Sequence, residues 1–283
     1  MSLLRSLLGV AVASLAASCT DGGKASEAHA THYVNVVAAT AAADIKDLET
    51  GLPLGVTQLS SLFANGASPS GDLAGVRSGL RKIRAVVPEL TRSASTFFAV
   101  ADAHGIAVRN DLEQDVMAGQ DVWKLFPALR RTTESPFVVG AGLFAGARVG
   151  PDADRDWVAA VPMKDGAGAY GGMLLGGWTM RRFAYHLQES LRHDLTDEQA
   201  KTKDPAKLPI VYVSVFDGSG VYSTPTTPAV NQKALTDLGL VQKTAAGMAH
   251  GVASITDRDF GWAAVRVPSA GPDTGVVLLW SEI

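Results

Sequence analysis

Two stretches in the first third of the chain repeat apolar residues at spacings of three and four, which is the pattern of amphipathic helices. The stretch from Tyr33 to Ala64 contains Gly51 and Pro53, so a bent or paired helix is expected there. The next helix is predicted to begin at Asp72, and Pro88 should kink or end it. The apolar stripes are Val34, Val37, Ala41, Ile45 and Leu48, then Leu73, Val76, Leu80, Ile83, Val87 and Leu90.

From Phe97 the pattern changes to short apolar runs separated by turn residues, which predicts strands. Helical turns are expected between Asp111 and Arg131. A further helix is expected from Met180, followed by a charged connector up to Lys207. The predicted strands are a hairpin within Phe97–Val108, then Phe137–Val149, Trp157–Met163 and Met173–Trp178.

The strand pattern then occurs a second time. Ile210–Tyr222, IVYVSVFDGSGVY, matches Phe97–Val108, FFAVADAHGIAV, and each contains an Asp-x-x-Gly turn. Later in each copy an Asp-Arg-Asp precedes an aromatic residue, and a tryptophan closes the last apolar run, Trp178 in the first copy and Trp280 in the second. Two copies of one module are therefore predicted.

Antiparallel strands joined by short turns, with helices at the ends of each block, indicate an α+β fold. In element order and in its two Asp-x-x-Gly hairpins the chain resembles the double Cache family of extracytoplasmic sensors. The resemblance implies long N-terminal helices followed by two PAS/Cache-like modules with antiparallel sheets. The expected segments are a signal peptide (1–19), a polar tether (20–32), an N-terminal helical region (33–96), a first module (97–180), a connecting helix and linker (181–207) and a second, smaller module (208–283).

The first 19 residues have the order of an export signal: one basic residue, Arg5, then an apolar run and small residues. The end, Leu15-Ala-Ala-Ser-Cys19, resembles the lipobox of bacterial lipoproteins, which implies lipidation of Cys19 and a membrane anchor. Leu stands one position further from the Cys than is usual, so cleavage by the ordinary signal peptidase stays open. A buried N-terminal helix is a third alternative.

Composition narrows the class of partner. The formal net charge of −3 gives no basic surface for nucleic acid. Cys19 is the only cysteine, so no disulfide can form within the chain and the core must hold the fold together.

Three motifs that could carry chemistry are better explained as turns. Gly166-Ala-Gly168-Ala-Tyr-Gly171 spells a dinucleotide-binding motif but leads into a strand-like run. The carboxylates of residues 152, 154 and 156 are spaced as in a calcium loop, whose later ligands are missing. Asp102 and His104 stand across a tight turn, and the second copy has Ser219 in place of the histidine. We therefore predict no catalytic residue, metal or cofactor.

Aromatic residues beside arginines are the better candidates for a binding site. A guanidinium grips a carboxylate by two hydrogen bonds, and an aromatic ring supplies an apolar floor. Tyr212 and Trp262 are weaker candidates in the second copy. The alternative is that the aromatics are core and the arginines solvated surface. The predicted ligand-binding residues of the first copy are Trp123, Arg130, Tyr170, Trp178 and Arg181.

The expected function is a sensor that binds a small molecule, such as a carboxylate, outside the cytoplasm. It would be anchored to the membrane by lipid and would signal through a separate receptor or kinase. The alternative is a structural or protein-interaction lipoprotein whose modules are filled by their own side chains. A hydrolase with an unrecognised site is the third possibility.

Overall fold

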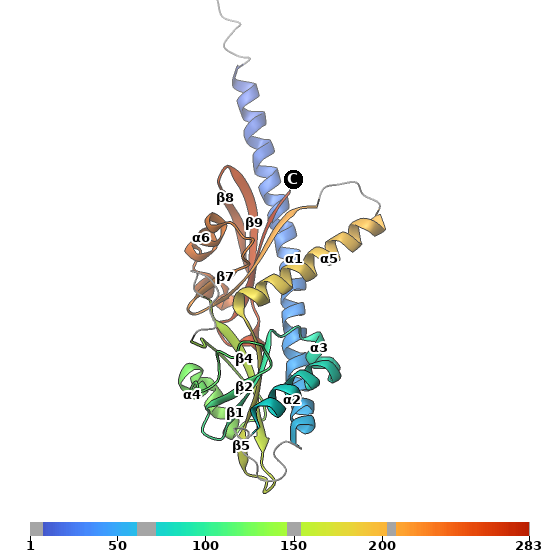
Figure 1. Cartoon of the computed structure of the whole chain (residues 1–283). Coiled ribbons are helices and arrows are strands. Elements are labelled where there is room, and N and C mark those ends of the chain that lie inside the picture. Colours follow the sequence, from blue (N-terminus) through green and yellow to red (C-terminus); the bar gives the residue numbers. More distant parts are fainter. Residues whose placement is uncertain (1–7, 61–71, 146–153, 203–207, 283) are drawn as a thin grey trace, which may run out of the picture. The chain divides into compact units, whose positions relative to one another are not determined.

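The computed structural model describes residues 8–60, 72–145, 154–202 and 208–282, and the side chains from Gly22 onwards (Figure 1). Within these ranges it has a long N-terminal helix and two five-stranded antiparallel sheets. The predicted α+β fold with two sheet modules is thereby confirmed. No helix among the described residues is long and apolar enough to cross a membrane.

The first helix, α1 (Leu8–Leu59), is longer than expected. All five apolar positions predicted for its stripe are buried. The helix continues through Gly51 and Pro53, where an interruption was expected, because Leu48 and Leu52 on either side of Gly51 are fully buried. Packing of an apolar face outweighs the local propensity of these two residues.

The second predicted helix is confirmed as α2 (Leu73–Val86), which the Asp72 carboxylate caps by accepting a hydrogen bond from the Gly75 amide at 2.8 Å. It ends just before Pro88, which begins the short helix α3 (Pro88–Arg92). Val76, Leu80 and Ile83 of α2 are buried, as the stripe predicted, whereas its first residue, Leu73, is exposed.

The first sheet has the strand order β2-β1-β5-β4-β3. One face, with Met173 and Leu175 of β5, packs against α4 and the 3-10 helix η3. The opposite face, with Leu174 and Gly176, packs against α1. Figure 1 shows α4 and α2 on opposite sides of this sheet. The elements are β1 (Phe97–Asp102), β2 (Ala107–Asn110), α4 (Val122–Leu125), η3 (Pro127–Thr133), β3 (Val138–Gly142), β4 (Asp156–Lys164) and β5 (Tyr170–Thr179).

The second sheet has the order β7-β6-β10-β9-β8, which is the order of the first sheet moved five strands along the chain. The predicted repeat is confirmed by this shared topology. The elements are β6 (Ile210–Asp217), β7 (Gly220–Ser223), α6 (Ala229–Asp237), α7 (Leu240–Lys243), η4 (Thr244–Ala246), β8 (Ala249–Ile255), β9 (Arg258–Arg266), η5 (Pro268–Ala270) and β10 (Gly275–Ser281).

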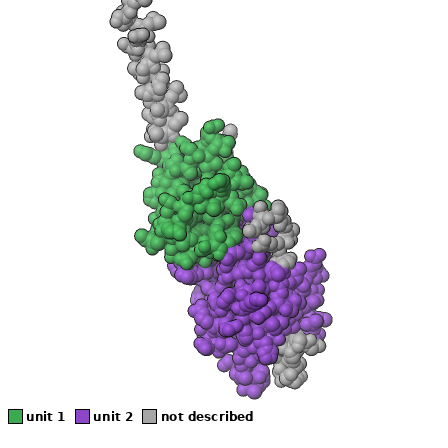
Figure 2. Space-filling model, turned by 90° about the vertical axis from the view of Figure 1, so that its left-hand side faces the viewer, with its two compact units in different colours: residues 1–39, 187–266, 273–283 green, residues 40–186, 267–272 purple. Residues whose placement is uncertain are grey.

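The chain divides into two compact units (Figure 2). We call the unit of residues 40–186 and 267–272 the first module, and the unit of residues 1–39, 187–266 and 273–283 the second module. Helix α5 (Met180–Thr202) follows β5 and contributes residues to both modules.

Two segments are more helical than expected. Residues 20–32, expected to be a polar tether, belong to α1. Ser26 and Ala30 of this segment are buried within the second module, so the helix has a surface to pack on. The connector after Asp194 is helical as far as Thr202, and residues 203–207 lie outside the described residues.

Candidate functional site

The turn between β1 and β2 is built around Asp102. Its Oδ1 accepts hydrogen bonds from the backbone amides of His104 and Ile106, both at 2.9 Å. In the second module, Oδ1 of Asp217 accepts in the same way from the amides of Ser219 and Gly220. The interpretation of Asp102 as a turn residue is confirmed.

The same turn supports Trp123, the first predicted site residue. Gly105 has φ +79°, and a Cβ at this position would lie 2.4 Å from Cδ2 of Trp123. The Val122 amide donates to the Gly105 carbonyl at 2.8 Å, which ties α4 to the turn. The glycine is therefore required twice, for its backbone conformation and for the approach of the indole ring.

Trp123 and Arg130 are brought together. The guanidinium carbon of Arg130 lies 5.6 Å from the centre of the Trp123 ring, within the range of a cation–π contact. Arg130 is exposed, whereas the indole nitrogen of Trp123 is buried and has no hydrogen-bond partner among the described residues. The exposed guanidinium is therefore the member of this pair that can reach a ligand carboxylate, and the indole ring supplies an apolar face beside it.

Tyr170 lies beside a hollow on the same side of the first sheet. Its hydroxyl is 3.3 Å from Thr132 Oγ1 on η3, and burial raises the pKa of Tyr170. The hollow has a volume of about 420 Å³ and is open to solvent. Its side chains combine hydroxyls with one cation and one carboxylate. The lining residues are Thr132, Thr133, Glu134, Ser135, Pro136, Pro162, Lys164, Gly168 and Tyr170.

Trp178 and Arg181 are not brought to this hollow. Trp178 is fully buried on the other face of the sheet, where its ring packs on Trp157 at 5.1 Å and on Phe183 at 4.4 Å. Arg181 follows β5, whereas Tyr170 opens it, so the two lie on the order of 30 Å apart along the strand. Strand alternation and strand length separate residues that the sequence placed in one group.

The space between the first sheet and α4 is filled by side chains. Phe144, which follows β3, is fully buried, 4.9 Å from the ring of Phe126 and 6.0 Å from that of Phe97. Its amide donates to Oδ2 of Asp156 at 2.9 Å. The Gln120 side chain bonds both the amide and the carbonyl of the next residue, Ala145. Phe144 is thus held in place both by hydrogen bonds of the backbone and by contacts of its ring.

Asp156 is almost completely buried, and burial raises its pKa to about 6. Asp154 Oδ1 accepts from the amides of Arg155 and Arg181, and Asp152 lies outside the described residues. No group of residues with metal-ligating side chains occurs in the part of the chain that the structure describes. The glycine-rich stretch from Gly166 forms the turn between β4 and β5, as predicted.

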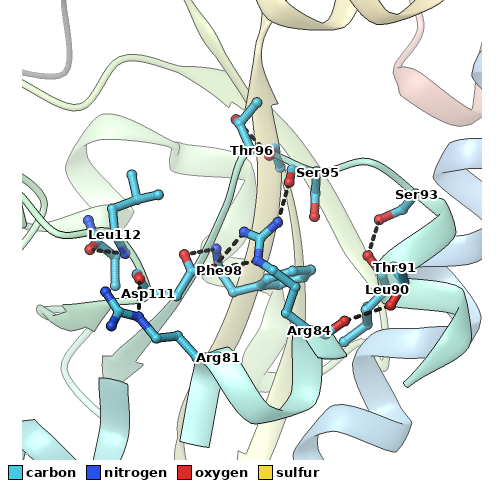
Figure 3. A network of polar contacts seen from close by, with 12 residues as sticks. Arg81, Arg84, Leu90, Thr91, Ser93, Ser95, Thr96, Phe98, Asp111 and Leu112 are labelled. Carbon is cyan, nitrogen blue, oxygen red and sulfur yellow. Dashed lines mark hydrogen bonds and ion pairs between the residues drawn. The ribbon is translucent and has the colours of Figure 1, made fainter. Parts of the chain in front are cut away.

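Sequence reasoning missed a polar network at the edge of the first sheet (Figure 3). Arg84 of α2 donates from Nε to Oδ2 of Asp111 at 2.7 Å and from Nη1 to the Ser95 carbonyl at 2.6 Å. Its guanidinium also lies 4.6 Å from the centre of the Phe98 ring. Arg84 lies off the apolar stripe, as a solvated residue does, and only the fold brings it to a buried carboxylate.

The second module also contains a hollow, of about 250 Å³, beside the turn of its first hairpin. The predicted candidates Tyr212 and Trp262 do not line it and are part of the apolar core. The lining residues are Phe216, Asp217, Gly218, Ser219, Gly220, Val221, Thr236, Gly239, Leu240, Val241 and Gln242.

The sequence matches no protein-family model, and no curated protein matches it. Solved structures do match. The extracellular domain assigned to the histidine kinase vpHK1S-Z8 has a TM-score of 0.55 and 9% identity, with 93% of each chain covered. A domain assigned to a sensory box/GGDEF family protein of Vibrio parahaemolyticus has a TM-score of 0.52 and 9% identity, with 92% of this chain and 97% of that chain covered.

An extracellular ligand-binding receptor from Desulfohalobium retbaense also matches, with a TM-score of 0.47 and 14% identity over 88% of this chain, which spans 40% of the receptor. At these identities the likeness is one of fold. The class defined by the topology is a pair of PAS-like modules behind a long helix. This is the architecture that the resemblance stated from the sequence implied, so the fold part of that prediction is confirmed.

Proposed function

We propose that the protein is a sensor that binds a small molecule in the hollow of its first module. The observation that carries the proposal is the polar lining of that hollow, with Lys164 and Tyr170 on the sheet side and Thr133 and Glu134 on the other. A few convergent polar groups in a concave site are typical of small-molecule recognition. The sensory-domain fold of the matching structures supports the same role.

The lining favours a small polar ligand that carries a carboxylate. Lys164 offers an ammonium group, and Tyr170 keeps its proton because burial raises its pKa, so it can donate a hydrogen bond. Arg130 presents an exposed guanidinium beside the Trp123 ring, and the hydroxyl of Thr133, which lines the hollow, donates to the Arg130 carbonyl at 3.1 Å. Arg130 is proposed as a second contact for a longer ligand.

We propose that the protein works outside the cytoplasm, anchored through a lipid on Cys19. The segment up to Cys19 has the order of an export signal. A Cys19→Ser variant should move from the membrane fraction to the soluble fraction and should lose the mass of the lipid. An unchanged distribution would exclude lipidation at Cys19.

The proposed output is a change in helix packing that a separate membrane receptor or kinase detects. A ligand can drive such a change only if it binds the two helix arrangements with different affinity. A tagged full chain should therefore co-purify a membrane protein after cross-linking, in an amount that changes when ligand is added. Recovery that is the same with and without ligand would contradict signalling through a partner.

A thermal-shift screen tests the binding function. The full chain is screened against amino acids, organic acids and amines, and a ligand present at 100 times its Kd should stabilise it by about 2.7 kcal/mol. Lys164→Gln should reduce the shift, whereas Lys124→Gln, an exposed lysine of α4 that does not line the hollow, should not. The proposal fails if no compound stabilises the chain.

A second function, a structural or protein-interaction module without a ligand, is favoured by one observation. The interior between the first sheet and α4 is filled by Phe97, Phe126 and Phe144. This alternative predicts that no compound in the screen stabilises the chain. It also predicts that Lys164→Gln does not weaken binding of a protein partner at a surface away from the hollow.

A further inference from the structure

The N-terminal part of α1 is joined to the second sheet by two pairs of histidine and carboxylate, all within the second module. Glu27 of α1 accepts from His250 of β8, with Oε1 and Nδ1 2.6 Å apart. His29 of α1 faces Glu282, directly after β10, with Nδ1 and Oε1 2.7 Å apart. The helix therefore supplies the acid in one pair and the histidine in the other.

The two pairs lie on either side of the line of contact between helix and sheet. Residues two apart on an α-helix project about 200° apart, so Glu27 and His29 point to opposite flanks. Strand β9 lies between β8 and β10. On β9, a Cβ at Gly261 would come within 2.1 Å of the backbone of Ser26 and Glu27, so the helix rests directly on this strand. The helix is thus held over β9 by one histidine–carboxylate pair on each side. We call the pairs Glu27–His250 and His29–Glu282 together the double clasp.

Aromatic rings also pack at the contact between α1 and the second sheet. The ring of Trp280 stacks on that of Tyr33, with centres 4.9 Å apart and planes 4° from parallel, and lies 5.3 Å from the ring of His29. The Tyr33 hydroxyl donates to Glu198 of α5 at 2.8 Å. Burial, followed by Glu198, raises the pKa of Tyr33 to about 12, so the hydroxyl stays a donor at physiological pH.

The charges around this part of α1 are mostly negative. On the helix itself are Lys24, Glu27, His29 and His32, and His32 lies edge-on to the Tyr33 ring. From the elements packed against it come Glu198 of α5, His250 of β8, Asp259 of β9 near Gly23, and Glu282. These groups are four carboxylates, three histidines and one lysine.

We propose that this double clasp makes the docking of α1 on the second sheet depend on protons, which gives the molecule a second input. Histidine as a residue type changes its charge between about pH 5 and 8. A protonated imidazole facing a carboxylate forms a charge-assisted hydrogen bond, which is stronger than a neutral one. The proposal uses no residue of the first module, so it stands or falls independently of the ligand site.

The sign of the effect follows from linkage. A histidine that gains a carboxylate partner on docking contributes stability that is present at acid pH and is lost as the pH rises through the histidine range. Glutamate as a residue type loses its charge below about pH 4, where a pair of this kind weakens again. Docking should therefore be tightest at mildly acid pH.

Hydrogen exchange of the backbone amides of residues 27–33, in the full chain, tests the proposal. After correction for the intrinsic rate of exchange, protection should rise roughly threefold or more between pH 8 and pH 5.5. The double variant Glu27→Gln and Glu282→Gln keeps neutral hydrogen-bond acceptors, so it should fold and lose this rise. His193→Gln, whose partner Asp197 lies one turn away on α5, is the matched control and should keep it.

Two outcomes overturn the proposal. One is protection of residues 27–33 that does not change with pH in the unmodified chain. The other is a rise that persists in the double glutamine variant, which would assign it to groups outside the clasp. The histidine variant His29→Gln with His250→Gln must behave like the glutamate variant, because each pair needs both members.

Discussion

The two modules share a sheet topology and differ in what their connections do. Both sheets place the first strand of the module next to the last one, in identical order. In the first module the Trp123 ring packs directly against Gly105 of the Asp-x-x-Gly turn. In the second module the equivalent glycine is Gly220, and a Cβ there would have only the Tyr222 side chain within 4 Å. The space beside the second turn is instead the smaller hollow. The sheet is a shared scaffold, and the turns determine where a site can form.

The connection between the third and fourth strands differs even more. In the second module it is the two-residue turn of Thr256 and Asp257, both with positive φ. In the first module it runs from Gly142 to Asp156, and it delivers Phe144 to the core. The longer connection thus places a side chain in the core of its module, whereas the two-residue turn is too short to reach the core. Four substitutions test this contrast, starting with the largest expected effect.

Phe144→Ala should destabilise the first module by about 3–5 kcal/mol, because it removes a fully buried ring from between two others. Urea unfolding measures the loss. Leu112→Ala, at a partly exposed apolar residue of the same module, is the control and should cost less than about 1 kcal/mol. A similar small loss for Phe144→Ala would show that the longer connection does not fill the core.

Asp156→Asn should stabilise the protein by about 3 kcal/mol at pH 7, since burial raises the pKa of Asp156 to about 6, above the value of about 3.9 for an unfolded chain. With the folded pKa the higher one, the stability linked to this carboxyl is present below about pH 4 and is lost as the pH rises through 6. Asparagine keeps an acceptor for the Phe144 amide.

Unfolding free energies at pH 4 and pH 7 check this. The gain should be absent at pH 4 and full at pH 7. Asp259→Asn, at the counterpart position in the second module, changes a half-exposed residue bonded to Ser254 and serves as the control. A gain of the same size at both pH values would contradict the assignment to Asp156 ionisation.

Gly105→Ala should cost about 1–3 kcal/mol, because alanine at φ +79° is strained and its Cβ would clash with Trp123. Gly220→Ala, the counterpart in the second module, should cost less than about 1 kcal/mol, since its surroundings are open. Thermal unfolding compares the two variants. Equal costs would mean that the two turns do not differ in the way described.

Lys164→Gln should change stability by less than about 0.5 kcal/mol, because Lys164 is an exposed side chain at the end of β4. Its effect should instead appear as weaker ligand binding, which calorimetric titration with a hit from the screen measures. Unchanged affinity would remove Lys164 from the proposed site.

The sequence predicted the parts of the fold that depend on local pattern. The apolar stripe of α1, that of α2 apart from the exposed Leu73, the two Asp-x-x-Gly hairpins and the repeat were correct. The extent of α1 was not predicted, because residues 20–32 are polar and small and only their contact with the second sheet, at Gly261, favours a helix there.

The site was predicted less well than the fold. Trp123 and Arg130 meet because both lie on consecutive helical turns after β2, which their sequence spacing allowed. Trp178 and Tyr170 share one strand, and only the face and end of the sheet separate them. Lys164 had no signal in the sequence, since an exposed lysine before a glycine-rich turn is ordinary. The role of Phe144 in the core could not be predicted either, because it depends on contacts with Phe97 and Phe126 that are distant in the sequence.

The most direct test of the central claim is a hydrogen-exchange map of the full chain with and without a stabilising compound from the screen. Binding in the first module predicts slower exchange in residues 132–136 and 162–170, which border the larger hollow. Exchange in residues 217–221 and 236–242, beside the smaller hollow, should not change. Protection confined to the second module, or spread evenly over both, would contradict the account.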